Sequence, residues 1–454
     1  MAPAPARRAA LDAVRQVRER EAFGHEVLSS VIAASDLSAR DTAFATRLAY
    51  GALAAQGTLD EVIDERLNDP QAVRATVRDV LRLGTYELLF MRTPARAAVN
   101  ESVEAMKLTD RGASGLVNAV LRRIAERADT FPWGDPAEDP AALARMTGSP
   151  AWLVEMWGVE LGRERASAAL ESSLEPAPLY VLHNPFHGEL AALMEALESD
   201  GAEPADCTLD GCVRCSNAAA AVRGEALREG LAIVTDAGAQ LPAVAATPRP
   251  SDVVLDVAAG RGTKTIGLQA AAVRAGGPAT VLAFDLHAFK IAALDRRMDM
   301  LRVPSVTGLV ADATDAEVLR DALGGRVPSV VLVDAPCSGL GTLRRHPDAV
   351  WRMDPERIPR LAQLQLEMVC AAARAAAEAD AIIYTTCTVS QRENGDVVEA
   401  FLSEGAGRDY HTDPLDDIVP GSWREFVTPE GWFQSLPLRG GPDGHFVARL
   451  VRTT

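Results

Sequence analysis

The sequence of 454 residues has no apolar run that approaches the roughly 18 residues of a membrane-spanning helix. Its start, with Arg7-Arg8, leads into an amphipathic pattern instead of the apolar core of a signal peptide. Six cysteines in so long a chain are too few for a disulfide framework. These absences argue against a membrane protein and a disulfide-stapled secreted protein. They predict a cytoplasmic protein whose free thiols are available for chemistry.

Positive charge is also scarce. The chain carries 46 Lys and Arg against 63 Asp and Glu, a formal net charge of −17. This balance argues against non-specific nucleic-acid binding, which depends on clustered basic residues that contact phosphates. A local arginine patch can still hold RNA, although a solvated surface explains such pairs at least as well. The candidates are Arg122-Arg123, Arg296-Arg297 and Arg344-Arg345-His346.

The length predicts about three domains. Residues 1–130 show helical spacing throughout, for example at Leu59, Val62, Ile63 and Leu67. The proline-rich stretch 131–140 cannot continue a helix, and we place the first boundary there. Residues 145–230 mix helical patches with one short apolar run at 179–182, which predicts a small α/β or α+β linker module.

Residues 231–454 alternate short, apolar, β-rich runs with helical segments. This pattern is typical of a Rossmann-like α/β domain with a mostly parallel, doubly wound sheet, whose ligands bind at the carboxyl ends of the strands. The predicted strands are Val253–Val257, Thr280–Phe284, Val306–Val310, Ser329–Val333 and Ala381–Thr385.

A glycine-rich turn follows the first of these strands. Its small residues let the backbone approach a ligand, and the next helix begins with unpaired amides. A turn of this kind can also be a plain connection. However, Asp285 ends the second strand, where an acid can bond both ribose hydroxyls, and Asp312 follows the third, placed to meet an adenine amine. Together these positions predict a nucleoside pocket. The turn residues are Ala258, Ala259, Gly260, Arg261, Gly262, Thr263 and Lys264.

Two cysteine peptides, Asp334-Ala335-Pro336-Cys337 and Thr385-Thr386-Cys387, each close a predicted strand. C5 of cytosine is a poor nucleophile, but a thiolate that adds at C6 turns C5 into an enamine-like carbon that accepts a methyl group. Asp334 can hydrogen-bond the ring edge while Cys337 or Cys387 attacks. Two thiols at neighbouring strand ends, above a cofactor turn, therefore predict cytosine C5 methyl transfer.

At these residues the chain resembles a known family. Residues 334–348, with Trp351-Arg352, closely resemble the motif of the RNA 5-methylcytosine methyltransferases of the Sun/RsmB type. Three further segments look like other motifs of that family. They are Tyr384–Thr388 with Glu393-Asn394 (the second cysteine motif), Asp236–Gln240 (the entry into the catalytic domain) and Asp443–Leu450 (the closing strand).

The resemblance implies roles for individual residues. In that family the cysteine after Thr-Thr is the nucleophile and the cysteine after Ala-Pro assists product release, which implies these roles for Cys387 and Cys337. It also implies S-adenosylmethionine binding by residues 258–264, Asp285, Asp312 and Asp334. The chain departs from the family pattern at Arg261, which replaces a proline, and at residues 181–184, where Val-Leu-His-Asn replaces Leu-Arg-Val-Asn.

Residues 98–103 and 115–123 resemble NusB, an RNA-binding antitermination factor. A NusB-like domain ahead of this catalytic domain implies an enzyme that methylates C5 of a cytidine in 16S rRNA. Two alternatives stay open. One is a tRNA cytosine-C5 methyltransferase with the same catalytic residues, and the other is a non-catalytic RNA-binding assembly factor that retains the fold. We expect a monomer.

Cys207, Cys212 and Cys215 have the beginnings of a metal-site spacing, but no fourth Cys or His with suitable spacing follows. The seven histidines form no metal-binding pair motif. We therefore expect no metal.

Overall fold

The computed structural model describes residues 4–22, 24–207, 209–346 and 348–453. The chain forms two compact units. The helical unit comprises Met1–Pro176 and Leu343–Asp354, and the sheet unit comprises Ala177–Thr342 and Pro355–Thr454. Among the described residues, no helix is both long and apolar enough to cross a membrane.

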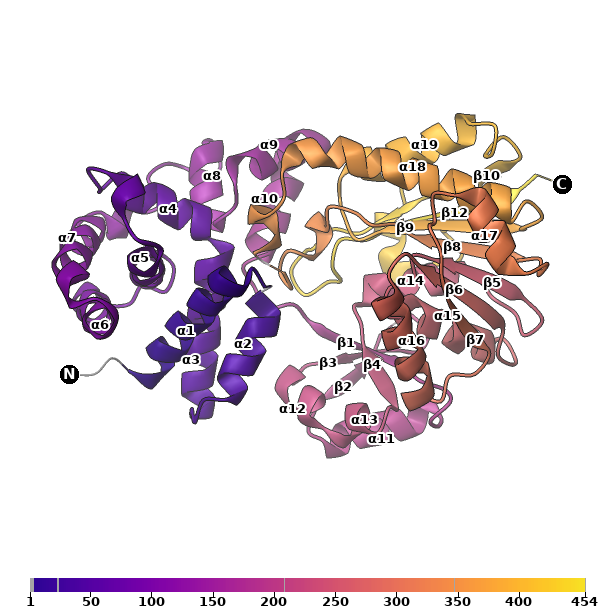
Figure 1. The fold of residues 1–454 in the computed structure, drawn as a ribbon, viewed down its shortest axis with the longest axis horizontal. Helices are drawn as coiled ribbons and strands as arrows, with labels where there is room; N and C mark the ends of the chain where they lie inside the picture. The colour runs from indigo at the N-terminus through magenta and orange to yellow at the C-terminus, as the bar shows by residue number, and fades with distance from the viewer. Residues whose placement is uncertain (1–3, 23, 208, 347, 454) are drawn as a thin grey trace. The chain divides into compact units, whose positions relative to one another are not determined.

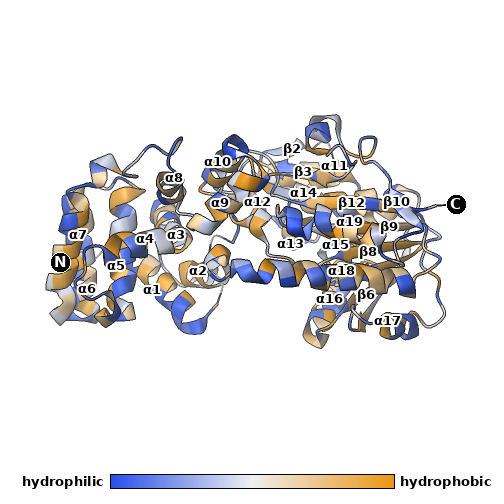
Figure 2. Cartoon of the chain, turned by 90° about the horizontal axis from the view of Figure 1, so that it is seen from above, coloured by the Kyte–Doolittle hydropathy of each residue, from blue (hydrophilic) through white to orange (hydrophobic). Residues whose placement is uncertain are grey.

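The first part of the helical unit is all-α, as the helical spacing predicted. Helices α1 to α7 share one apolar core, and Figure 2 shows both hydrophobic and hydrophilic residues on helices such as α1 and α5. They are α1 (Pro5–Arg20), α2 (Gly24–Ala33), α3 (Ala39–Ala54), α4 (Gln56–Asp64), α5 (Ala75–Leu89), α6 (Ala95–Thr109), α7 (Ser114–Ala125), α8 (Pro140–Thr147), α9 (Ala151–Glu160) and α10 (Arg163–Ser172).

The helical unit also contains Leu343–Asp354. This segment includes the second half of the family motif that begins at Asp334. The indole Nε1 of Trp351 donates to the carbonyl of Ala54 at 2.6 Å. The ring of Trp351 lies against Gly57, where a Cβ atom would approach it to 2.1 Å. The Asp348 carboxylate accepts the amide of Gly24 at 3.2 Å. Half of the motif that carries the family resemblance therefore packs on helices of the first domain. Pro347 of this motif lies outside the described residues.

The sheet unit begins with a small antiparallel sheet of strand order β2-β3-β1-β4. The linker module therefore has the α+β arrangement, which is one of the two predicted from the sequence. The compact units separate at Pro176, inside the expected 145–230 module, so α8 to α10 cluster with the helical unit. The module contains β1 (Leu179–His183), α11 (Leu190–Ser199), β2 (Pro204–Asp206), β3 (Cys212–Cys215), α12 (Ala218–Arg223), α13 (Glu225–Arg228) and β4 (Ala232–Val234).

The main sheet has the strand order β10-β12-β9-β8-β5-β6-β7, with β11 paired to β12 (Figure 1). Strands β5 to β9 are parallel, and β12 runs antiparallel beside β9. This confirms the predicted Rossmann-like sheet. Its strands are β5 (Val253–Val257), β6 (Thr280–Asp285), β7 (Val306–Val310), β8 (Val330–Asp334), β9 (Ala381–Thr386), β10 (Tyr410–Thr412), β11 (Phe433–Gln434) and β12 (Phe446–Arg452).

Both faces of the sheet are covered. Val254 packs on one face with residues of α14 and α15, whereas Leu255 and Val257 pack on the other with residues of α18 and α19. From β5 the chain runs to β6 and β7 on one side and then to β8 and β9 on the other. The order reverses between β5 and β8, which is where such sheets bind ligands. The helices are α14 (Ala237–Ala245), α15 (Thr263–Arg274), α16 (Ala288–Met300), α17 (Ala316–Leu323), α18 (Ile358–Ala375) and α19 (Gly395–Ser403).

Candidate active site

The predicted cofactor turn connects β5 to α15. Gly260 and Gly262 adopt left-handed backbone conformations, with φ of 59° and 81°. A Cβ atom on Gly262 would also lie 2.8 Å from the Met298 side chain, so this position requires glycine. Arg261, which replaces the family's proline, keeps its side chain exposed and accepts a hydrogen bond from Arg297 at its carbonyl, at 3.3 Å. The turn thus combines its two left-handed glycines with an arginine between them.

Asp256, a buried acid, begins the glycine-rich segment 256–264 but was not among the predicted site residues. Its Oδ2 accepts the hydroxyl of Thr265 at 2.5 Å, and among the described residues its Oδ1 has no hydrogen-bond partner. Burial, reinforced by the charge of Asp334, raises the pKa of Asp256 to about 7. An acceptor left open beneath a glycine turn at the sheet's reversal point fits a nucleoside cofactor there. The only signal in the sequence was a single charge in an otherwise apolar strand.

The raised pKa of Asp256 predicts a pH-dependent stability. An unfolded aspartate titrates near 3.9, so between about pH 4 and 7 the folded chain holds a proton that the unfolded chain has lost. The free energy of unfolding should therefore fall as the pH rises through this window, by an amount on the order of 4 kcal/mol from this group, and then level off. Urea unfolding of the wild type and of Asp256→Asn at several pH values measures the difference.

The exposed acid Asp321, replaced by Asn, provides the control for this comparison. The Asp256→Asn variant should gain stability relative to the wild type as the pH rises from 5 to 7, whereas Asp321→Asn should follow the wild type. A difference between wild type and Asp256→Asn that does not change with pH would contradict the assignment.

Of the two predicted nucleoside acids, the structure brings Asp285 to the cofactor turn. Its Oδ2 accepts the amide of Gly260 at 3.2 Å and pairs with Lys290 at the same distance. Asp312 instead is exposed and bonds within its own loop, where its Oδ1 accepts the amide and hydroxyl of Thr314 at 2.9 and 2.7 Å. These hydrogen bonds from Thr314 lower the pKa of Asp312.

Lys264 and Asp334 form an ion pair between the cofactor turn and the end of β8. The Nζ of Lys264 lies 2.7 Å from Oδ1 of Asp334. Burial is the largest influence and opposes the positive charge of Lys264, but attraction to Asp334, Cys387 and Asp256 together outweighs it, so the pKa of Lys264 is raised and the ammonium stays charged. The positive charge of Lys264 also lowers the pKa of Cys387, so it favours the thiolate form of that side chain.

The two thiols predicted from the sequence lie side by side. Strands β8 and β9 are parallel neighbours with Asp334 in register with Thr385, and the Sγ atoms of Cys337 and Cys387 are 3.2 Å apart. The Cys387 amide also points at the Cys337 sulfur, at 3.3 Å. Both side chains are half-buried. A thiol pair this close can share one proton.

The hydrogen bond between the two thiols shifts their pKa values in opposite directions. It lowers the pKa of Cys387, helped by Lys264, whereas the same bond together with burial raises the pKa of Cys337. The arrangement therefore favours a thiolate on Cys387 that accepts a hydrogen bond from a neutral Cys337. A thiolate is the nucleophilic form of cysteine.

Backbone contacts hold the cysteine loops against the loop before β12. The amide of Gly341 donates to the carbonyl of Cys387 at 3.0 Å, and the amide of Gly444 donates to that of Gly341 at 2.8 Å. A Cβ atom on Gly341 would approach the Gly444 carbonyl to 2.0 Å, so the approach requires glycine. This close contact has no periodic signature in the sequence.

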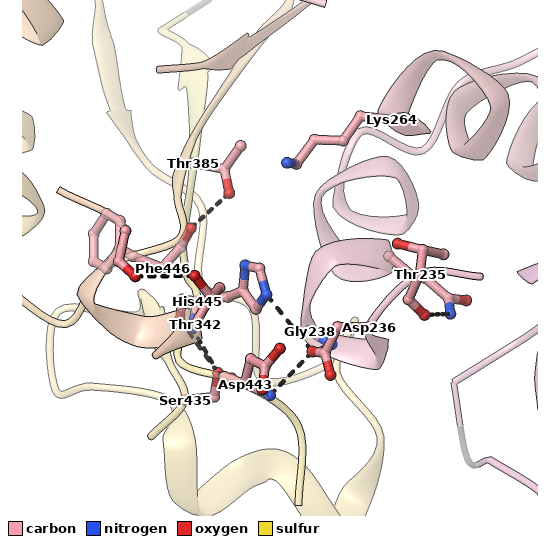
Figure 3. A network of polar contacts seen from close by, with 12 residues as sticks. Thr235, Asp236, Gly238, Lys264, Thr342, Thr385, Ser435, Asp443, His445 and Phe446 are labelled. Carbon is pink, nitrogen blue, oxygen red and sulfur yellow. Dashed lines mark hydrogen bonds and ion pairs between the residues drawn. The ribbon is translucent and has the colours of Figure 1, made fainter. Parts of the chain in front are cut away.

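Asp236, Asp443 and His445 form a buried polar cluster next to this loop (Figure 3). Oδ1 of Asp236 accepts the amides of Gly238 and Asp443, at 2.8 and 3.1 Å, and lies 3.6 Å from Nε2 of His445. Groups of this type can ligate a metal ion, but the Asp236 oxygen already joins the start of α14 to the loop before β12. The segments 236–240 and 443–450, which both resemble family motifs, are thus connected by the hydrogen bond from the Asp443 amide to Asp236.

The three cysteines of the linker module do not converge on one point. Cys212 packs in the core beneath the main sheet, whereas Cys215 packs in the separate core of the module. Cys207 neighbours Cys212, and a hydrogen bond with that thiol lowers its pKa to about 7. Two thiols facing one core and a third facing another do not form a shared metal site.

Two family models match the chain. The NusB family model matches residues 4–126, and the model described as 16S rRNA methyltransferase RsmB/F matches residues 243–451. The chain is 32% identical to the ribosomal RNA small subunit methyltransferase B of Thermus thermophilus, over 91% of this chain and 89% of that protein. It is 31% identical to the protein of the same name from Pseudomonas putida, over 91% of each chain.

Solved structures share the fold. The crystal structure of PH0851 has a TM-score of 0.80 at 22% identity and covers 100% of both chains. The structure of NSun6 from Pyrococcus horikoshii with SFG has a TM-score of 0.55 at 17% identity and covers 67% of this chain and 98% of that chain.

The sheet, the glycine turn and the matched family model define a Rossmann-like RNA methyltransferase that uses S-adenosylmethionine, with a NusB domain at its N-terminus. Within this class, the chain belongs to the ribosomal RNA small subunit methyltransferase B family.

Proposed function

We propose that this enzyme methylates C5 of a cytidine in 16S rRNA through a transient covalent bond between Cys387 and C6 of the ring. The observation that carries the proposal is the thiol pair of Cys337 and Cys387, 3.2 Å apart at the ends of adjacent strands. A methyltransferase acting on a nucleophilic nitrogen or oxygen needs no such pair. A pyrimidine carbon needs one thiolate to activate it.

Cys387 is the proposed nucleophile. Its lowered pKa, caused first by the hydrogen bond from Cys337, maintains a thiolate that can add to C6. Addition places electron density on C5 and makes that carbon nucleophilic. Bound S-adenosylmethionine supplies the methyl group in an electrophilic form. We assign its binding to residues 258–264 with Asp285, Asp312 and Asp334.

Asp334 and Cys337 complete the proposed site. The Asp334 carboxylate, with one oxygen held by Lys264, is placed to hydrogen-bond the ring edge of the cytosine. After methylation, C5 loses its proton and the Cys387 sulfur leaves C6. Cys337, whose neutral thiol lies next to that sulfur, can return a hydrogen bond to the departing thiolate and thereby assist release.

The proposed target is 16S rRNA in the cytoplasm, and we propose that the enzyme acts as a monomer without a metal. The relatives from T. thermophilus and P. putida are both named as methyltransferases of small-subunit ribosomal RNA, which supports this target. The NusB domain also supports it. The two alternatives are a tRNA methyltransferase and a non-catalytic assembly factor. Different results of the following experiment would indicate each of them.

Bisulfite sequencing of 16S rRNA and tRNA, from cells with and without this gene, tests the target. We expect one 16S cytidine to lose its resistance to bisulfite when the gene is deleted and to regain it when the wild-type gene is returned. Loss at a tRNA cytidine instead would assign the enzyme to tRNA. Unchanged methylation of both RNAs would favour the assembly factor.

A further inference from the structure

A single buried carboxylate joins the two cysteine loops. The residue after Cys337 is Ser338, and both its amide and its hydroxyl donate to Glu393, at 2.8 and 2.5 Å. The residue after Cys387 is Thr388, whose hydroxyl lies 2.8 Å from that of Ser338. Glu393 and Thr388 are fully buried, and Ser338 is 6% exposed. The backbone positions immediately beyond each sulfur are therefore connected through one side chain.

Two further side chains hold Glu393 in place. The Nε2 of Gln365, on α18, donates to Oε1 of Glu393 at 3.1 Å and to the carbonyl of Pro336 at 2.9 Å. The hydroxyl of Tyr384, on β9, donates to the Glu393 carbonyl at 2.6 Å. The Glu393 carboxylate is thus held from α18 and its backbone carbonyl from β9, so the residue cannot follow a shift of either cysteine loop without breaking these bonds.

Burial of the Glu393 carboxylate costs folding free energy. Burial raises the pKa of Glu393, and the hydrogen bonds from Ser338 and Gln365 oppose that rise only in part. A buried hydrogen-bond acceptor destabilises the folded state unless all of its partners are present. The chain retains it between two loops that also contact each other through the Gly341 amide with the Cys387 carbonyl and through the thiol pair.

We propose that Glu393 is a positioning residue that fixes the separation of the Cys337 and Cys387 sulfur atoms through Ser338 and Thr388. It touches neither sulfur in this account and acts through the loops that carry them. Its relevance to catalysis depends on the proposed function, but its effect on the thiol pair does not. Because the hydrogen bond from Cys337 is the main cause of the lowered pKa of Cys387, loss of the separation should make Cys387 less reactive.

The variants Glu393→Asp and Glu393→Gln distinguish positioning from charge. Aspartate keeps the charge but is one methylene shorter, so it cannot hold Ser338 and Gln365 together. Glutamine keeps the length and an acceptor oxygen but loses the charge. Glu399→Asp, an exposed acid on α19, is the matched control. Circular dichroism and S-adenosylmethionine affinity identify variants that remain folded.

Two thiol measurements provide the readout on the purified full chain. The first is the alkylation rate of Cys387 by iodoacetamide as a function of pH, followed by mass spectrometry of its peptide. The second is the rate of Cys337–Cys387 disulfide formation with diamide, which takes up the two electrons and two protons released when the S–S bond forms. Both depend on the sulfur separation, and neither requires RNA.

We expect Glu393→Asp to slow alkylation of Cys387 near neutral pH and disulfide formation by about tenfold or more, with Glu393→Gln closer to wild type and Glu399→Asp unchanged. If Glu393→Asp does not fold, Ser338→Ala keeps the amide bond to Glu393 but removes the hydroxyl bonds to Glu393 and Thr388, and it should slow both reactions. Wild-type thiol rates in a folded Glu393→Asp or Ser338→Ala variant would overturn the proposal. Normal thiol rates combined with lost methyl transfer would leave the proposed function intact, so the two can fail separately.

Discussion

Replacing Cys387 with Ala is expected to abolish methyl transfer while leaving S-adenosylmethionine binding unchanged. Without the thiolate, C6 has no nucleophile and C5 stays too electron-poor to attack a methyl group. Removal of a covalent nucleophile typically costs at least about 10⁴-fold in rate. Transfer of radiolabelled methyl groups to 16S rRNA measures the loss, and calorimetry measures the cofactor affinity.

The control for this variant is Cys370→Ala, which removes a buried thiol of α18 that packs in the core behind the sheet. It should lower thermal stability slightly and keep methyl transfer close to the wild-type rate. Methyl transfer by Cys387→Ala within about tenfold of the wild-type rate would rule out Cys387 as the nucleophile.

Replacing Cys337 with Ala should trap the enzyme on its RNA. In the proposed mechanism, the neutral Cys337 thiol lies next to the sulfur that leaves C6, and its hydrogen bond stabilises the departing thiolate. Without it, methylation of C5 can still proceed, but release becomes slow. We expect a protein–RNA adduct that survives denaturing electrophoresis and that forms only when S-adenosylmethionine is present.

The double variant Cys337→Ala with Cys387→Ala distinguishes this adduct from non-specific cross-linking, since it lacks the sulfur that bonds to C6. No adduct should form. Normal turnover by Cys337→Ala, with no accumulated adduct, would contradict the proposed role of Cys337 in release.

The fold of the sheet unit was predictable because each strand carries its own local signal. The buried runs Val253–Val257 and Val306–Val310 are strands with the predicted bounds, and the cysteine peptides close β8 and β9 as expected. Parallel neighbours bring their carboxyl ends to one edge, so the proximity of Cys337 and Cys387 followed from topology alone.

Features that depend on tertiary contacts were not predictable in this way. Leu343–Asp354 follows a catalytic strand in sequence but packs in the helical unit through Trp351, and no periodicity indicates that. Glu393 appeared only as part of a motif, because its contact with Ser338 joins positions far apart in the chain. Asp312 follows a strand as predicted, and its bonds to Thr314 within its own loop are contacts that strand spacing does not indicate.

The central claim, a bond between the Cys387 sulfur and C6 of a cytidine, can be measured directly with 16S rRNA that contains 5-fluorocytidine. Fluorine at C5 cannot leave as a cation, so the wild-type enzyme should stall after methyl transfer. Mass spectrometry of the digested complex should then find the modified nucleotide on the peptide that contains Cys387. A nucleotide attached to Cys337 or to any other residue, or no covalent complex at all, would contradict the account.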